Sequence, residues 1–244
     1  MRNRTAVQLL ILLGGSLGLY FLFIRIEYPW NWRVPWEYRR LFLHGFYNTL
    51  VVSVGAIVMG FCFGILGGLA RVSKNLLVRE LSAIYVEVFR GTPLLVQIYI
   101  FYFCVAAVVH FDNPLLIGMI TLALFSGAYI SEMVRAGIES IDKGQVEAAL
   151  STGMGEWLTM RHVVFPQALR RIIPPVAGQF VSLIKDSSLL SVISVRELTK
   201  ASEILNATTY KTFEAYLPLA GLYLLLTYPL SYLTRRLEEK MKHD

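Results

Sequence analysis

Charged residues along the chain are gathered into short clusters that long apolar runs separate. Five of these runs carry no charge, and a sixth, Ile172–Val195, is long enough to span but is interrupted by Lys185 and Asp186. A helix needs about 20 mostly apolar residues to cross a bilayer core of roughly 30 Å. The pattern therefore predicts an all-α integral membrane protein with six transmembrane helices. The five charge-free runs are Val7–Ile24, Gly45–Ala70, Gly91–Val109, Asn113–Ser131 and Ala215–Thr234.

The composition supports the membrane interpretation over a large soluble protein with buried core helices. Of the 244 residues, 55% are hydrophobic and 16% are charged, whereas a soluble domain is about 25% charged. The cysteines, Cys62 and Cys104, lie in apolar runs and are expected to pack as small hydrophobic side chains. No two histidines have metal-ligand spacing, so we expect neither a metal site nor a cofactor bound by this chain.

The basic residues predict an orientation. With a cytoplasmic amino terminus, 14 of the 23 Lys and Arg residues fall in cytoplasmic segments and six in external ones. The positive-inside rule favours this arrangement, which places both termini in the cytoplasm. The net charge is +6, but the basic residues do not form a basic face on a soluble fold. We therefore expect no nucleic-acid partner. The cytoplasmic segments are 1–5, 71–79, 135–171 and 235–244.

The first apolar run resembles a signal peptide, because Arg2 and Arg4 precede it. It is longer than a usual signal core, and no small-residue cleavage site follows, so we expect a retained span. Five aromatic residues come next, as expected where a helix meets the membrane interface. They are Tyr28, Trp30, Trp32, Trp36 and Tyr38.

The glycine positions predict one helix-packing face, and they do not indicate a catalytic or nucleotide-binding motif. Gly60, Gly64 and Gly68 recur every four residues in the second run, a spacing that lets another helix approach closely. The alternative is incidental glycine on a lipid-facing helix. The match of 14–18 to a G-x-S-x-G nucleophile motif lies inside a spanning helix and is read as coincidence. No Gly-Lys dipeptide occurs, so there is no P-loop, and we do not expect an enzyme.

The long cytoplasmic segment predicts a helix–glycine–helix element. Gln145–Thr152 contains good helix formers and is ended by Gly153, while Glu156–Val164 forms a second helical piece that stops before Pro166. Residue physics leaves two readings open. The element is either a rigid unit that transmits force or an interfacial connection between spans.

The same segment resembles the signature of permease subunits of ATP-binding-cassette (ABC) importers. That signature reads EAA-x3-G-x9-I-x-L-P, and this chain keeps the spacing throughout. Glu147, Ala148, Ala149, Gly153 and Pro166 match, with Val163 and Phe165 in place of Ile and Leu. Three further stretches, 89–97, 126–138 and 183–189, resemble spans of the polar amino-acid (histidine, glutamine and arginine) uptake family.

The resemblance covers roughly 45–236 and implies a type I importer core of five helices, with one extra amino-terminal span. The domains expected are therefore the extra span and its aromatic loop (1–44), the permease domain (45–236) and a cytoplasmic tail (237–244). Glu147–Gly153 would be the cytoplasmic coupling helix that docks on the ATPase. The implied partners are an ABC ATPase dimer, which holds the ATP and Mg²⁺, an extracytoplasmic solute-binding protein and a second permease chain, identical or homologous. The implied location is the bacterial inner membrane, with the lipid bilayer around the spans.

Lys185 and Asp186 are candidates for the substrate path. Ionisable groups at membrane depth cost at least about 2.5–3.5 kcal/mol when they face lipid, so they should face a cavity or partner. With Ser187 and Ser188, they offer partners for the carboxylate and ammonium of an amino acid. The alternative is an internal ion pair or a helix break. Thr92, before Pro93, should break the third span, and Gln97 one turn later is a weaker candidate for lining the path.

Two further pairs, Glu87–Arg90 and Glu132–Arg135, have i, i+3 spacing, and we read them as structural or gating pairs. The competing function is an ion-coupled secondary transporter or channel for a small polar solute, using Lys185 and Asp186. That function leaves the importer signature unexplained. An opine, a sulfur amino acid or another small polar solute stays open as the substrate.

Overall fold

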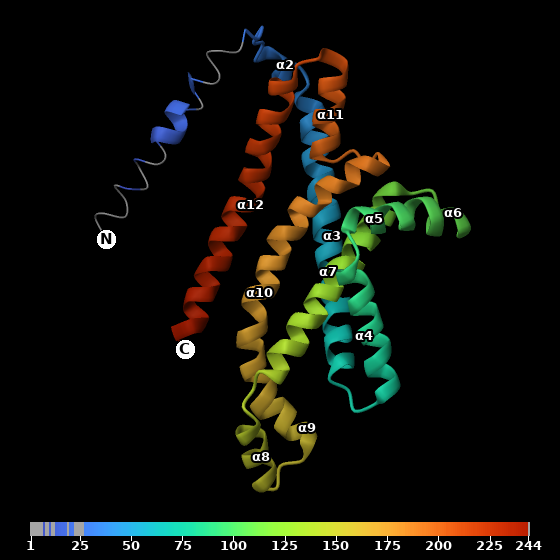
Figure 1. Cartoon of the computed structure of the whole chain (residues 1–244), viewed down its shortest axis with the longest axis vertical. Helices are drawn as coiled ribbons and strands as arrows, with labels where there is room; N and C mark the ends of the chain where they lie inside the picture. Colours follow the sequence, from blue (N-terminus) through green and yellow to red (C-terminus); the bar gives the residue numbers. More distant parts are fainter. Residues whose placement is uncertain (1–6, 8–9, 11–12, 19, 22–26, 244) are drawn as a thin grey trace.

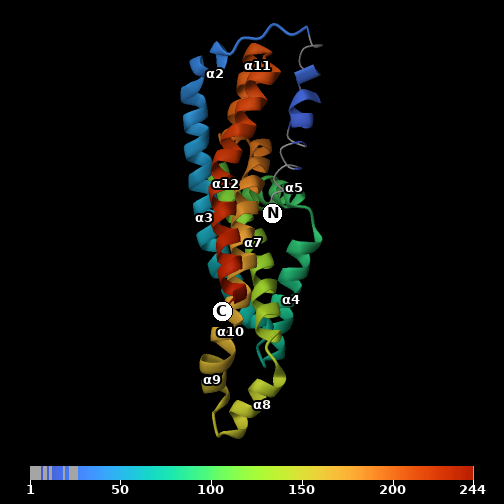
Figure 2. The same cartoon turned by 90° about the vertical axis from the view of Figure 1, so that its left-hand side faces the viewer.

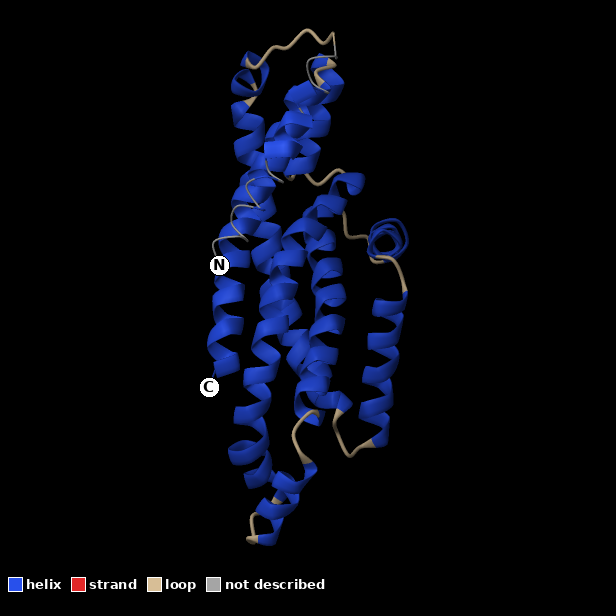
Figure 3. Cartoon of the chain, turned by 60° about the vertical axis from the view of Figure 1, so that its left-hand side comes forward, coloured by secondary structure: helices blue, strands red, loops and turns tan. Residues whose placement is uncertain are grey.

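The computed structural model is an elongated helical bundle and describes residues 7, 10, 13–18, 20, 21 and 27–243 (Figure 1). The described residues contain helices, turns and loops but no strand (Figure 3). The helices are α2 (Arg33–Glu37), α3 (Arg39–Arg71), α4 (Leu76–Gly91), α5 (Leu94–Tyr99), α6 (Ala106–Val108), α7 (Pro114–Glu139), α8 (Lys143–Ser151), α9 (Glu156–Thr159), α10 (Phe165–Asp186), α11 (Leu198–Thr209) and α12 (Thr212–His243). Two π-helical turns, η1 (Ile100–Val105) and η2 (Met160–Val164), and a 3₁₀ helix, η3 (Ser187–Ile193), connect them.

Four helical stretches in the described residues are long and apolar enough to cross a membrane. They are Arg39–Arg71, Pro114–Glu139, Glu156–Ile193 and Thr212–Met241. A fifth candidate consists of two helices, Leu76–Gly91 and Leu94–Val108, which meet at an angle of 107°. Of the expected first span, 7–24, residues 8, 9, 11, 12, 19 and 22–24 lie outside the described residues.

The buried core forms three clusters that follow one another along the bundle, whose helices are labelled in Figure 2. The middle cluster joins α3, α5, α7 and η3 around Leu122 and Leu190. A second cluster joins α7 to α10 at the end where α8 and α9 lie, which we call the α8 end. The third packs α2, the start of α3, α11 and α12 around Leu198 at the opposite end, which we call the α11 end.

The apolar run Gly91–Val109, predicted as one span with a break at Thr92–Pro93, is not a straight spanning helix. Thr92 is extended (ψ 145°) and Pro93 follows it in the same region (ψ 136°), which ends α4. Proline lacks an N–H and excludes the helical conformation of the residue before it. The expected break at Thr92–Pro93 is thus present, and the helix before it, α4, includes charged residues that the apolar pattern missed.

The prediction that the second cytoplasmic helix stops before Pro166 was wrong. The helical stretch runs from Glu156 to Ile193 without interruption. Pro166 lies in the first turn of α10, directly after the π-helical turn η2. A first-turn proline needs no hydrogen-bond partner for its nitrogen, and the wider π turn accommodates its ring.

Candidate functional site

The helix α8 is capped at both ends by residues of the signature segment. Asp142 accepts a hydrogen bond from Gly144 N at 2.6 Å before the first turn. After the last turn, Gly153 adopts a left-handed conformation (φ 87°), and Met154 N donates to Ala149 O at 3.3 Å. This is a glycine-ended helix terminus, in which a side chain at residue 153 would strain the backbone. The sequence therefore encodes both the length of α8 and the turn after it.

The exposed face of α8 carries two of the signature residues. Ala149 is buried against the bundle, whereas Glu147 and Ala148 face outward. The helix lies at the far end of the molecule, beyond the ends of α4 and α12 (Figure 1). Gln167 Nε2 donates to Gln145 Oε1 at 2.6 Å and so connects α8 to α10. The arrangement presents a small, rigid, exposed helix that is attached to the long helix α10.

Two further contacts connect the α8 end to neighbouring parts of the bundle. Lys74, in the loop between α3 and α4, forms an ion pair with Glu156 at the start of α9. Arg171 of α10 donates to the carbonyl oxygen of Ser140 after α7. A displacement of α8 and α9 would therefore reach the α3–α4 loop as well as α7 and α10.

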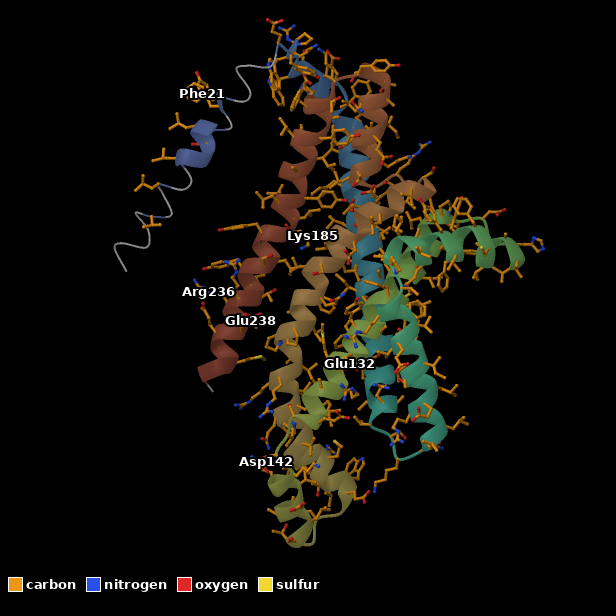
Figure 4. The ribbon with its side chains drawn as sticks, viewed as in Figure 1. Phe21, Glu132, Asp142, Lys185, Arg236 and Glu238 are labelled. Carbon is orange, nitrogen blue, oxygen red and sulfur yellow. The ribbon has the colours of Figure 1, made fainter. Side chains whose placement is uncertain are left out.

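Glu132 on α7, labelled in Figure 4, forms ion pairs with arginines from three helices. Its carboxylate pairs with Arg135 on the same helix at 2.5 Å. Arg71 at the end of α3 and Arg90 on α4 each approach it to 3.8 Å. The expected Glu132–Arg135 pair is present. Among the described residues, Arg90 has its ion pair with Glu132 and not with Glu87, because the α4 face that carries Arg90 packs against α7.

Lys185 and Asp186 end α10, where the chain passes into η3 near the middle of the long axis (Figure 4). Lys185 is exposed and Asp186 is half-buried. Ser187 is fully buried and donates to Ile184 O at 2.7 Å, while Ser188 is half-buried. The structure therefore leaves the ammonium of Lys185 open and holds the hydroxyl of Ser187 inside the helix.

Gln97 is buried inside the α4–α5 bend. Its amide nitrogen donates to Phe89 O at 2.8 Å, and to Thr92 O at 3.1 Å and Thr92 Oγ1 at 2.8 Å. These acceptors belong to the end of α4, where backbone carbonyls lack helical partners. Thr92 and Gln97 thus form one polar cluster that closes the bend.

The three regularly spaced glycines of α3 face α7. A Cβ atom added at Gly60 would lie 2.2 Å from Ser126 Oγ, and one at Gly64 would lie 2.3 Å from Ile130 Cγ2. At Gly68 the added atom would lie 2.4 Å from Val134 Cβ. Such distances exclude any side chain without movement of α7, so the two backbones approach as closely as glycine allows.

Two buried carboxylates at the α11 end were not anticipated from the sequence. Glu197 accepts from Thr199 N, Lys200 N and Tyr223 Oη, each at 2.8 Å, and so connects α11 to α12. Burial raises the pKa of Glu197, against the opposing effect of these hydrogen bonds. Glu214 accepts from Tyr28 Oη at 2.6 Å. The only sequence signal for Glu197 is an acid directly before a helix, and glutamate is not a favoured cap.

Comparisons with known proteins agree with this geometry. The family described as binding-protein-dependent transport system inner membrane component matches residues 41–243. The glutamine transport system permease protein GlnP of Escherichia coli K12 is 37% identical over 216 residues, covering 87% of this chain and 98% of GlnP. The probable glutamine ABC transporter permease protein GlnM of Bacillus subtilis 168 is 37% identical over 203 residues, covering 82% of this chain and 94% of GlnM.

Solved structures share the fold. A crystal structure of an amino acid ABC transporter with histidines has a TM-score of 0.82 and 33% identity, and covers 87% of this chain and all of that one. The MetNI methionine ABC transporter, at 18% identity and a TM-score of 0.70, supports the fold alone. In such importers ATP hydrolysis belongs to a separate subunit. The chain belongs to the family of binding-protein-dependent transport system inner membrane components and is the membrane-spanning permease subunit of an ABC importer.

Proposed function

We propose that this chain forms the translocation path for a polar amino acid of the glutamine type and couples it to an ABC ATPase through α8. The observation that carries the proposal is the exposed helix at the α8 end, with Glu147 and Ala148 outward and Gly153 fixing its turn. Two curated relatives are named as glutamine permeases, which supports the substrate class.

The docking element would consist of Glu147, Ala148, Ala149 and Gly153, with Pro166 at the start of the helix behind it. Small alanine side chains permit close approach of a partner surface, and the connections to α10 and the α3–α4 loop would carry its movement into the spans. The ATP and Mg²⁺ would lie on the ATPase dimer. A solute-binding protein would deliver substrate at the α11 end, and a second permease chain would complete the path.

The substrate path would pass the junction of α10 and η3. Lys185 is exposed there and presents an ammonium group to a substrate carboxylate, while Asp186 and Ser188 offer acceptors for an ammonium. Ser187, with Thr92 and Gln97 in the adjoining bend, would hold the local backbone in place. Six spans with both termini in the cytoplasm agree with the distribution of Lys and Arg.

Reconstitution tests the coupling. Proteoliposomes that contain this chain, its ATPase and its binding protein should take up labelled glutamine. Uptake should occur only when ATP is present on the side of the membrane that carries the ATPase. Glu147→Arg should abolish uptake and ATPase co-purification, whereas Glu239→Arg, at an exposed acid of α12, should change neither. Uptake driven by an ion gradient without any ATPase would instead favour the secondary transporter.

The substrate site has its own test in the same vesicles. Lys185→Met and Asp186→Asn should each lower uptake while leaving ATPase binding intact. Full uptake by the double variant would exclude both residues from the path.

A further inference from the structure

A large apolar groove runs along the outside of the bundle near the α11 end, and its lining residues belong neither to α8 nor to the α10–η3 junction. It encloses about 740 Å³ between α2, the start of α3 and the first half of α12. Its walls include Trp32, Trp36, Phe42, Phe46, Leu222 and Leu225. Arg39 is the charged member of its described lining. Figure 1 shows α2, α3 and α12 converging there.

A second hollow of about 370 Å³ lies beside the groove on α3. It is lined by Arg40, Leu43, His44 and Tyr47. Leu43 borders both spaces. The consecutive residues Arg39 and Arg40 therefore line two adjacent hollows, one each, and Leu43 lies between these hollows.

The arginines have spare hydrogen-bonding capacity. The guanidinium of Arg39 stacks over the Trp36 ring at 5.2 Å, and Nη1 donates to Trp36 O at 3.1 Å. Among the described side chains, no carboxylate lies within ion-pair distance of Arg39 or Arg40. A guanidinium has five N–H donors and binds phosphate in a bidentate manner. The acid nearest in sequence, Glu37, carries one negative charge against the two positive charges of Arg39 and Arg40.

We propose that this region is a binding site for one anionic glycerophospholipid of the leaflet at the α11 end. The phosphate would lie between Arg39 and Arg40, and the two acyl chains would pass on either side of Leu43. Tryptophan and arginine side chains are typical of the level where headgroups lie, which fits Trp32 and Trp36 beside these arginines. Net positive charge that no protein carboxylate neutralises selects an anionic headgroup over a zwitterionic one.

The groove can be blocked without disturbing the fold. A Cβ atom added at Gly221 of α12, which lines the groove, meets no atom within 4 Å. Gly221→Trp should therefore fill the space from the α12 side and displace an acyl chain. This variant separates loss of the lipid from loss of structure.

Native mass spectrometry of the assembled transporter, purified from nanodiscs of phosphatidylglycerol or phosphatidylcholine, tests the site. The unmodified chain should retain phosphatidylglycerol and release phosphatidylcholine. Arg39→Gln with Arg40→Gln should lower retention about tenfold or more, which corresponds to about 1.4 kcal/mol, because the phosphate loses charge-assisted hydrogen bonds. Arg33→Gln, which removes an exposed arginine outside both hollows, is the matched control.

Three results would overturn the proposal. They are equal retention of both lipids, unchanged retention in the Arg39 and Arg40 variant, and unchanged retention in Gly221→Trp. Cysteine cross-linking of two copies through position 221 would show that a second chain, and not a lipid, fills the groove.

Discussion

Gln97 donates a hydrogen bond from Nε2 to the carbonyl oxygen of Phe89, 2.8 Å away on the other side of the α4–α5 break. The carbonyl belongs to the last turn of α4, where no helical N–H can reach it. One side chain thus supplies the partner that the helix end lacks, and it fixes the direction in which the chain leaves the bend.

Replacement of Gln97 by leucine should destabilise the protein. The change keeps the volume roughly constant but leaves the carbonyls of Phe89 and Thr92 without this donor, at a cost of about 1–3 kcal/mol. Thermal unfolding of the detergent-solubilised chain measures the effect. Thr92→Ser, which retains the hydroxyl acceptor, is the control, and an unchanged Gln97→Leu melting temperature would contradict this role.

The contact between α3 and α7 can be tested at Gly64. An alanine there places its Cβ 2.3 Å from Ile130 Cγ2, and such overpacking costs about 1–3 kcal/mol. Gly178→Ala, where the added atom meets nothing within 4 Å, should have little effect. Adding Ile130→Ala to Gly64→Ala should recover part of the loss, and the lack of any recovery would place the strain elsewhere.

Neutralisation of Glu132 should have a much larger effect than neutralisation of Glu139. Glu132→Gln removes the carboxylate that Arg71, Arg90 and Arg135 share. Because this side chain is 23% exposed, we expect a loss of about 1–3 kcal/mol, below that of a fully buried pair. Glu139→Gln, at an exposed position, should change stability by less than about 0.5 kcal/mol. Chemical unfolding of both variants at one salt concentration decides the comparison.

Charge reversal at Lys74 and Glu156 separates stability from coupling. Their side chains are 81% and 69% exposed, so either reversal should alter stability by less than about 1 kcal/mol. If the pair carries movement from α9 to the α3–α4 loop, Lys74→Glu or Glu156→Lys should lower ATP-driven uptake, and the double reversal should restore it. A double variant as impaired as the single ones would argue against a direct contribution of this ion pair.

The buried Glu197 should make stability depend on pH. Burial raises its pKa in the folded state, so the folded chain holds the proton more tightly than the unfolded chain does. Stability is then greatest below the unfolded pKa of glutamate and falls as the pH rises through the raised value. Glu197→Gln should remove this slope from melting temperatures measured across pH 4–8. The groups that donate to this carboxylate, Tyr223 Oη and the backbone N–H groups of Thr199 and Lys200, remain in the variant.

The sequence predicted the helical class, most of the spans and the position of the α4–α5 break, because charge-free runs and proline act locally. It did not include α4 (Leu76–Gly91) among the spans, because charged residues such as Glu87 and Arg90 interrupt its apolar positions. It also assigned Arg90 to Glu87, since i, i+3 spacing is visible in a sequence and the approach of α7 is not. Glu197 was missed for a similar reason: its partner Tyr223 lies 26 positions away.

The glycine-lined contact between α3 and α7 limits how this protein can change shape. Backbones that touch along Gly60, Gly64 and Gly68 cannot slide past one another without collisions at Ser126, Ile130 and Val134. The two helices must therefore move as one rigid body, and other helices change position relative to it. Opening and closing would then fall to α4–α6 on one side and α10–α12 on the other, with hinges at Thr92–Pro93 and at the α10–η3 junction.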